Sequence, residues 1–367
     1  MKNLTYIFDI GSSKITLLAC CVKKGKTIIV TSVDKLYDGF MDGEFFSVDQ
    51  LPEVFKQLIN EMQERLSCKI NSVYVGVPSE FCACVCKRVT RNYVPSKKLV
   101  EADIQALFDG TSDFTDNQDY LVINFSTMEY EIDKVKTLQL SNKKVSNFSM
   151  DCCYILAKKD FINTIEQSLQ DCEVGVEFIS TSLAQANLCM KDMCNKLSPI
   201  AIVDVGHITT SVAIAKGEGL MMLSSFSLGG GHITADLMQV ANIGFSEAEL
   251  IKRKVSLTVQ SKKDERYSVY TNGKTVNALI NITNEVVNAR LEHIAKIINK
   301  VLDQNPIFKD IPVYVTGDGV CNFRGVKNLF EVTINRPIHM FKTIYNDTNN
   351  QYQTSKLGLA SLVGELI

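Results

Sequence analysis

Apolar and polar positions follow the same order in two distant segments of the chain. Residues 4–20 contain an apolar run, the polar turn Asp9-Ile10-Gly11-Ser12-Ser13 and a second apolar run. Residues 199–215 repeat this order around Asp204-Val205-Gly206-His207. Because glycine adopts turn conformations that other residues avoid, each segment predicts two strands joined by a tight D-x-G turn. Asp9 and Asp204 lie 195 positions apart, so the pattern indicates two large duplicated halves rather than short repeats.

Longer segments between these strands place apolar residues at the spacing of an amphipathic helix. They comprise residues 54–66, 161–169 and 286–302, and Asp160 stands at a plausible N-cap position before the second. Helices and strands therefore interleave along the chain, which predicts an α/β fold.

Residues 83–150 have a different pattern. Short apolar strands at 82–89, 120–125 and 135–140 flank the polar stretch 109–119. Such a mixture predicts an α+β subdomain inserted into the first half.

The sequence contains 12 cysteines, of which Cys82, Cys84 and Cys86 alternate along one predicted strand. Alternating positions share one face of a strand, so we interpret these thiols as small apolar residues of a buried face. No two cysteines have C-x-x-C spacing and only four histidines are present, which argues against a zinc site. This many free thiols require a reducing compartment, so we predict a cytoplasmic location.

Charge and composition exclude several function classes. The 367 residues carry a formal net charge of −2, which argues against a nucleic-acid partner. Hydrophobic residues make up 46% and charged residues 22%, values typical of globular proteins. No apolar run approaches the roughly 18 residues of a membrane span, and we expect no signal peptide.

The two D-x-G turns are suited to binding a nucleoside triphosphate, because turn amides form nests for anions. Asp9 and Asp204 would lie near the phosphates and hold a magnesium ion, through its water molecules. Further donors beside the turns are Ser12, Ser13, Lys14, Thr209 and Thr210. A single D-x-G turn is more often an ordinary hairpin, but two copies in the same frame favour the phosphate interpretation.

Two later segments fit the same pocket. Ser227-Leu228-Gly229-Gly230-Gly231 precedes a predicted helix, and glycines allow a backbone to approach a ligand, although a flexible turn is the alternative. Glu249 and Lys252 share one face of the predicted helix 245–255. They form either a solvated ion pair or a pair that grips a ribose. A further strand, residues 311–315, runs into Thr316-Gly317-Asp318-Gly319.

Together these motifs resemble the actin-like ATPases, and most closely the bacterial cell-division family FtsA. The motifs that carry the resemblance are, in order, F-D-I-G-S-S-K, V-D-V-G-H-I-T-T, S-L-G-G-G-H-I-T-A-D-L, A-E-L-I-K-R-K and V-T-G-D-G. The resemblance implies two RNase-H-like domains around a nucleotide cleft, with an FtsA-type α+β inserted subdomain. It also implies ATP and magnesium as ligands, with Gly317, Asp318 and Gly319 at the adenosine.

The resemblance further implies subdomain boundaries and partners. The first domain would comprise 1–82, 151–198 and 339–367, with the insertion at 83–150. The second would comprise 199–240 and 303–338, with its smaller subdomain at 241–302. Family members form filaments, bind the division protein FtsZ and act at the inner face of the membrane at the division site.

The sequence departs from the family pattern at several positions. His207 and Ile208 replace glycines of the second turn, and Asp318 replaces a glycine of the adenosine loop. A Cβ at a position that needs positive φ or close approach to a phosphate carries a steric cost. Because Asp tolerates unusual φ better than most residues, we expect the adenosine loop to form but with lower affinity. His207 either donates to a phosphate or faces solvent at the rim. Residues 180–185 offer no acid to orient water, and Gln185 stands a turn too late, so we expect slow hydrolysis or none.

Several alternatives remain open at this point. Residues 356–367 predict a core helix, whereas a membrane helix would need a basic face. The basic membrane tail of the family is absent, so the tail was removed or the protein reaches the membrane through a partner. A basic cluster is either a solvated face or a contact for an acidic partner or filament neighbour; it comprises Lys87, Arg88, Arg91, Lys97 and Lys98. The rival functions are a PilM-like, non-polymerising adaptor that binds a peptide of a membrane partner, and a phosphotransferase or phosphatase.

Overall fold

The structure is a computed structural model that describes residues 4–23, 26–114, 117–140, 144–191, 193–259, 262, 264–341 and 353–366. By its internal contacts the chain divides into two compact units. Unit 1 comprises residues 1–200, 213–224 and 343–367, and unit 2 comprises residues 201–212 and 225–342. Ile367, the last residue of the predicted C-terminal helix, lies outside the described residues.

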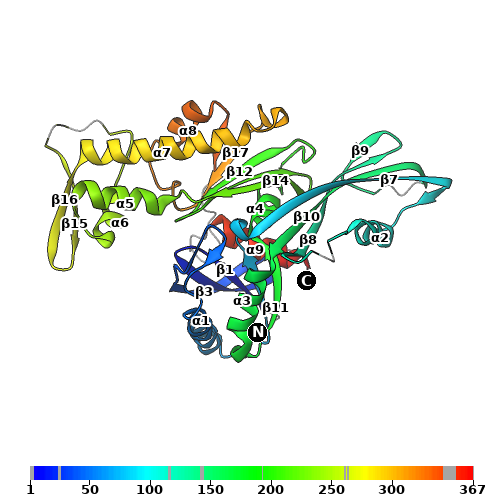
Figure 1. Ribbon diagram of the computed structural model, residues 1–367, viewed down its shortest axis with the longest axis horizontal. Coiled ribbons are helices and arrows are strands. Elements are labelled where there is room, and N and C mark those ends of the chain that lie inside the picture. The colour runs from blue at the N-terminus through cyan, green and yellow to red at the C-terminus, as the bar shows by residue number, and fades with distance from the viewer. Residues whose placement is uncertain are drawn as a thin grey trace. The chain divides into compact units, whose positions relative to one another are not determined.

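A five-stranded sheet forms the centre of unit 1 (Figure 1). Its strand order is β11-β6-β1-β2-β3, with β2 antiparallel to both neighbours and β1, β6 and β11 parallel. The strands are β1 (Thr5–Ile10), β2 (Lys14–Lys23), β3 (Lys26–Leu36), β6 (Ser72–Val77) and β11 (Gly175–Ser180). Around them lie β4 (Phe40–Met41), β5 (Glu44–Phe45), η1 (Ser79–Phe81) and η2 (Gln170–Cys172).

Helices cover both faces of this sheet. On one face α1 (Leu51–Leu66) and α3 (Lys159–Leu169) pack, and the ring centroids of Phe8 and Phe55 are 4.9 Å apart there. On the other face α4 (Thr181–Met190) and α9 (Thr354–Leu366) pack, where Leu359 and Val363 are buried. The predicted helices are confirmed, and α9 belongs to the core.

One detail of these helices was predicted wrongly. Asp160 does not cap α3, because the helix begins two residues earlier than the apolar pattern indicates. Lys158 occupies the N-cap position, and Asp160 lies in the first turn. A carboxylate in a first turn still interacts favourably with the helix dipole.

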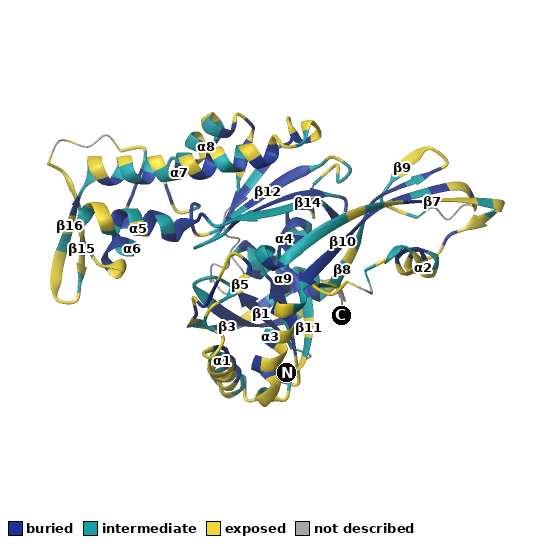
Figure 2. Cartoon of the chain, in the orientation of Figure 1, coloured by how far each residue is buried: buried dark blue, intermediate teal, exposed yellow. Residues whose placement is uncertain are grey.

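The inserted region forms a second, four-stranded sheet with the order β7-β10-β8-β9. Its strands are β7 (Cys82–Lys98), β8 (Tyr120–Ile132), β9 (Val135–Thr137) and β10 (Lys144–Lys158). The sequence did not predict α2 (Glu101–Thr111), whose buried side chains are Ile104, Leu107 and Phe108. Figure 2 shows that the far part of β7 is exposed, whereas the second half of β10 is buried.

A third sheet has the order β14-β13-β12-β17-β18, the same order as the sheet of unit 1. Its strands are β12 (Ile200–Val205), β13 (Thr210–Lys216), β14 (Gly219–Phe226), β17 (Val313–Thr316) and β18 (Ile338–Met340). Because β12, β17 and β18 are parallel, as are β1, β6 and β11, the duplication expected from the D-x-G turns is confirmed.

The remaining described elements, all in unit 2, are helical apart from one hairpin. They are α5 (Gly230–Ala241), α6 (Phe245–Lys252), β15 (Arg266–Thr271), β16 (Lys274–Leu279), α7 (Ile280–Leu302), η3 (Pro306–Phe308) and α8 (Val326–Ile334). The predicted apolar stripe of α7 is buried at Val287, Leu291, Ile294 and Ile298. Arg290 of the same helix donates to both carboxylate oxygens of Asp236 on α5, at 2.6 and 2.8 Å.

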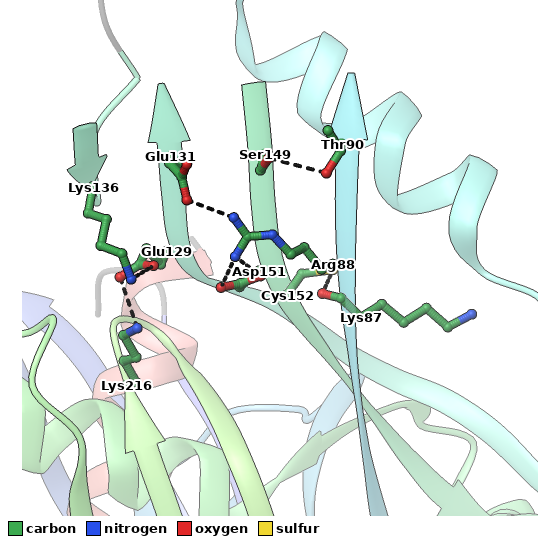
Figure 3. Close-up of polar contacts among 10 residues, drawn as sticks. All are labelled: Lys87, Arg88, Thr90, Glu129, Glu131, Lys136, Ser149, Asp151, Cys152 and Lys216. Carbon is green, nitrogen blue, oxygen red and sulfur yellow. Dashed lines mark hydrogen bonds and ion pairs between the residues drawn. The ribbon is translucent and has the colours of Figure 1, made fainter. Parts of the chain in front are cut away.

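Most of the predicted basic cluster is paired within the inserted subdomain. Arg88 donates to Asp151 at 3.2 Å and to Glu131 at 2.7 Å (Figure 3). Lys97 pairs with Asp103 at 2.6 Å, and Lys87 pairs with Asp113. These partners neutralise much of the charge that an acidic ligand would need.

A buried carboxylate connects the inserted subdomain to the end of β13. Glu129 has a side chain only 3% exposed and lies 2.8 Å from both Lys136 and Lys216 (Figure 3). Burial by itself raises the pKa of Glu129, but hydrogen bonds from the two lysines outweigh it and leave the pKa below its usual range. The charged form is therefore the one that stabilises the fold.

We expect Glu129→Gln to destabilise the protein by about 2 kcal/mol, because two ammonium groups lose their shared anion. Since the folded pKa lies below the unfolded value of about 4.3, the stabilisation is present above that value and is lost as the pH falls through the folded pKa. Urea unfolding at several pH values measures both effects. Glu331→Gln, which breaks an exposed pair with Lys327, is the control, and equal losses for the two variants would contradict the prediction.

Candidate nucleotide-binding site

The two D-x-G turns have the same hydrogen-bonded geometry. The N–H of Gly11 donates to the carbonyl of Lys14 at 3.0 Å, and the N–H of Gly206 donates to that of Thr209 at 2.9 Å. A Cβ added to either glycine would lie 3.0 Å from the same carbonyl oxygen. Both predicted hairpins are thus confirmed as structural copies.

The turn of unit 1 places its aspartate against α9. Asp9 is buried, and its Oδ2 accepts a hydrogen bond from the Ser355 hydroxyl at 3.2 Å and lies 3.9 Å from the Lys356 ammonium. Lys356 also donates to Gln353 at 2.8 Å. Lys14 lies 4.0 Å from Asp34, in an exposed pair. Sequence reasoning missed the Lys356 contact, which balances part of the Asp9 charge.

In unit 2, three predicted segments come together through glycines. The N–H groups of Gly230 and Gly231 donate to the carbonyls of Gly206 and His207, at 2.9 and 2.6 Å. The N–H of Gly319 donates to the carbonyl of Val205 at 2.9 Å. The second turn, the start of α5 and the segment after β17 therefore meet, as the site prediction requires.

Close backbone approach explains these glycines. A Cβ on Gly229 would lie 2.6 Å from the carbonyl oxygens of Gly206 and His207, and one on Gly230 would lie 2.6 Å from the Cα of Gly319. Because the N–H groups of Gly230 and Gly231 are already bonded within the protein, the glycines first serve to pack the loops together.

The departures from the family pattern are accommodated without the expected backbone strain. None of the described residues His207, Ile208 and Asp318 has positive φ, whereas Gly317 has φ +96°. His207, Ile208 and Asp318 therefore carry no positive-φ strain, and beside Asp318 it is Gly317 that takes the left-handed conformation. A cost from close approach to a phosphate stays a prediction.

The His207 ring packs within unit 2. Its Nε2 lies 2.8 Å from the position that a Cβ on Gly231 would occupy. Its ring centroid is 6.1 Å from that of Phe245, in an edge-to-face arrangement. The imidazole thus fills the space beside the bare Gly231 backbone.

Glu249 and Lys252 form a buried network at the start of α5. The Lys252 ammonium is paired with Glu249, with side chains 9% and 20% exposed, and donates to Thr234 Oγ1 at 2.7 Å and to the Gly230 carbonyl at 3.0 Å. Thr234 also donates to Glu249. The alternative of a solvated ion pair is therefore wrong, and Thr234 is a member that the sequence did not indicate.

The network holds Glu249 ionised. Burial by itself raises the pKa of Glu249, but hydrogen bonds from Lys252 and Thr234 outweigh it and lower the pKa. Burial lowers the pKa of Lys252, and the bond to Glu249 opposes this only in part.

The hydroxyl groups near the turns differ in burial and in hydrogen bonding. Thr210 is fully buried and donates to the carbonyl of Leu228 at 2.5 Å, so it anchors the loop before α5. Ser12, Ser13 and Thr209 are partly exposed. Gln185 is buried in α4, one turn from Thr181 at its start.

The described ranges contain neither a metal-binding cluster of side chains nor a membrane-spanning helix. No group of three or more His, Cys, Asp or Glu side chains in these ranges is arranged to hold a metal ion. No helix in the described part of the chain has the length and apolar character needed to cross a membrane.

Two sheets of one strand order, each with a D-x-G hairpin, define the actin-like ATPase fold. Solved structures agree. The chain is 13% identical to a chain of the PilM-PilN type IV pilus biogenesis complex, covering 99% of this chain and 97% of that one with a TM-score of 0.63. It is 12% identical to MreB5 of Spiroplasma citri bound to AMPPNP, covering 100% and 96% with a TM-score of 0.54.

Sequence comparisons identify the family. The family model described as type IV pilus assembly protein PilM matches residues 8–265, and that described as cell division protein FtsA matches residues 201–364. A curated relative, cell division protein FtsA of Buchnera aphidicola subsp. Baizongia pistaciae, is 22% identical over 98% of this chain and 89% of its own length. The PilM model covers more than half of the chain, which therefore belongs to the PilM family. It is also similar to cell division protein FtsA, by the model over its C-terminal part and by the curated relatives over most of its length.

Proposed function

We propose that this protein binds ATP with magnesium and acts as a filament-forming scaffold of the FtsA type in bacterial cell division. The observation that carries the proposal is the pair of D-x-G turns with matching geometry, one of them joined to the glycines of α5 and of the segment after β17. Relatives named cell division protein FtsA match most of the chain, which supports the cellular role.

In this proposal both turns contribute groups that bind the triphosphate. Asp9 and Asp204 provide carboxylate oxygens, and Ser12, Ser13 and Thr209 provide hydroxyls, a set of hard oxygen donors that suits magnesium. Because Asp9 already contacts Lys356, it would hold the ion through water. Bound magnesium would neutralise phosphate charge and orient the phosphates.

Asp204→Asn is expected to weaken magnesium–ATP binding at least about tenfold, since one carboxylate near the phosphates is lost. Isothermal titration calorimetry with and without EDTA measures this loss, and Asp310→Asn, at an exposed position of unit 2, is the control. Unchanged affinity in both Asp204→Asn and Asp9→Asn would contradict the assignment of the pocket.

We further propose that hydrolysis is slow or absent and that ATP acts as a conformational switch. The start of α4, Thr181 to Gln185, offers no acid, and Gln185 is buried. Turnover of many ATP molecules per second would contradict a scaffold role.

The second candidate is a PilM-like adaptor that does not polymerise and binds a peptide of a membrane partner. The extent of the PilM family match and the similarity to the PilM chain favour it. Electron microscopy with ATP, magnesium and lipid separates the two, because filaments or sheets support the FtsA-type scaffold. With FtsZ as its partner, such a scaffold would act in the cytoplasm, at the inner face of the membrane at the division site.

A further inference from the structure

Three thiols gather on one face of the inserted sheet. Cys86 of β7 is directly opposite Cys153 of β10 in the antiparallel register, and Cys84 lies two residues along β7, on the same face. The Cys84 thiol interacts with both other thiols, an interaction that raises the pKa of Cys84. The alternating cysteines share a strand face, as predicted, but the prediction that this face is buried is wrong at Cys86, which is exposed. They belong to a cluster completed by a cysteine 67 residues further on.

This cluster holds the beginning of β14 by its backbone. The N–H of Leu220 donates to Cys153 Sγ at 3.2 Å, and the carbonyl of Leu220 accepts from Cys84 and Cys86, both at 3.3 Å. Cys86 also donates to the carbonyl of Met221 at 3.3 Å. Thiols therefore take the place of a neighbouring strand for these backbone groups.

The three thiols differ in accessibility. Cys86 is exposed, Cys84 is half-buried and Cys153 is buried. The hydrogen bond with Cys84 lowers the pKa of the Cys86 thiol, against the opposing effect of burial. Cys20 and Cys321 behave differently, because burial raises the pKa of each to about 12. Oxidants react with accessible thiols through their thiolates, and Cys86 is the thiol of this cluster that an oxidant reaches from solvent.

We propose that Cys86 is an oxidation site, at which hydrogen peroxide generates a disulfide between Cys86 and Cys153. The Cys86 thiolate attacks one peroxide oxygen, the O–O bond breaks, and the departing hydroxide takes up a proton to leave as water. The Cys153 sulfur then attacks the sulfenic acid sulfur, the S–O bond breaks and a second water leaves. Two thiols are oxidised by two electrons, and one peroxide is reduced to two waters.

The register selects Cys153 as the partner of Cys86. Directly opposed residues of an antiparallel pair have Cα atoms about 4.5–5.5 Å apart, within the roughly 4.4–6.8 Å that a disulfide spans. Cys84 and Cys86 lie about 6.6–6.8 Å apart along one extended strand, at the limit of this range. The disulfide would remove two of the three thiols that hold Leu220, and so release the beginning of β14.

Peptide mapping after brief exposure of the whole chain to hydrogen peroxide tests the proposal. We expect a peptide pair joined through Cys86 and Cys153, and loss of the Cys86 thiol roughly tenfold faster than loss of the exposed thiol of Cys194. In Cys153→Ser the reaction is expected to stop at a Cys86 sulfenic acid, which dimedone traps. In Cys194→Ser the disulfide forms as in the unmodified chain.

Hydrogen exchange at the Leu220 amide supplies a second readout. Exchange is expected to accelerate after oxidation of the unmodified chain, and not after the same treatment of Cys86→Ser or Cys86→Ala. Two Cys86 variants are used so that, if one of them does not fold, the other still provides the test. Cys86 reacting no faster than Cys194, or no Cys86–Cys153 link once Cys86 is consumed, would overturn the proposal.

Discussion

Gly317→Ala is expected to destabilise the protein by about 3 kcal/mol or more, the largest loss for any glycine of the site. Gly317 has φ +96°, and an added Cβ would lie 2.2 Å from the carbonyl oxygen of Val205 and 2.4 Å from Oδ1 of Asp204. The first is a backbone atom of a buried strand, so it cannot move without displacing β12. Urea unfolding monitored by circular dichroism measures the loss.

Gly273→Ala is the matched control for this prediction. Gly273 also has positive φ, +76°, but an added Cβ there would meet no atom within 4 Å. Gly273→Ala should therefore lower the stability only by the conformational cost of a side chain at positive φ, about 1 kcal/mol. A difference of about 2 kcal/mol between the two variants isolates the crowding. Equal losses would show that the close approach at Gly317 is not rigid.

The turns and helices of this fold show which features could be predicted from the sequence and which could not. The two hairpins were predictable, because a D-x-G turn between apolar runs is a local pattern. The helices with regular apolar spacing were predictable for the same reason. The residue with positive φ in Thr316-Gly317-Asp318-Gly319 was not predictable, because φ depends on how the turn packs against Val205. Asp318 consequently has no need of the unusual φ that an aspartate tolerates, because Gly317 adopts it.

The missed contacts are those that join distant parts of the chain. Lys356 reaches Asp9 across nearly the full length of the sequence, and Cys153 completes a cluster that begins on another strand. Thr234 lies in a helix whose local pattern gives it no special role. Helix α2 was missed because Ile104, Leu107 and Phe108 are too few to establish a period, and packing on the inserted sheet stabilises it.

A double-mutant cycle on Glu249 and Lys252 is expected to show strong coupling. Lys252→Met leaves a buried carboxylate without its cation, and Glu249→Met leaves a buried ammonium, so each should cost about 3 kcal/mol. The variant with both substitutions should lose much less than the sum, because no buried charge remains. The exposed pair Glu292 and Lys296 is the control, with a coupling of about 0.5 kcal/mol or less.

The pair of Glu249 and Lys252 also makes the stability of the protein depend on pH. Because the pKa of Glu249 is lowered in the folded protein, its stabilisation is present above the unfolded value of about 4.3 and is lost as the pH falls through the folded pKa. Urea unfolding at several pH values should show a larger loss in the unmodified chain than in the double variant, in which Glu129 still titrates but Glu249 is gone. An identical pH dependence in both would contradict an ionised Glu249.

The double variant also separates the two roles that remain for this pair. If Glu249 and Lys252 contact the ribose, the variant recovers stability but binds ATP at least about tenfold more weakly. If they only hold α6 against the start of α5, affinity recovers together with stability, because Thr234 and Gly230 keep their places. Unfolding and calorimetry on the same four proteins therefore distinguish a ligand-binding pair from a structural one, which neither single substitution can do. Additive losses in stability would contradict the coupling itself, since the two charges would then be independent.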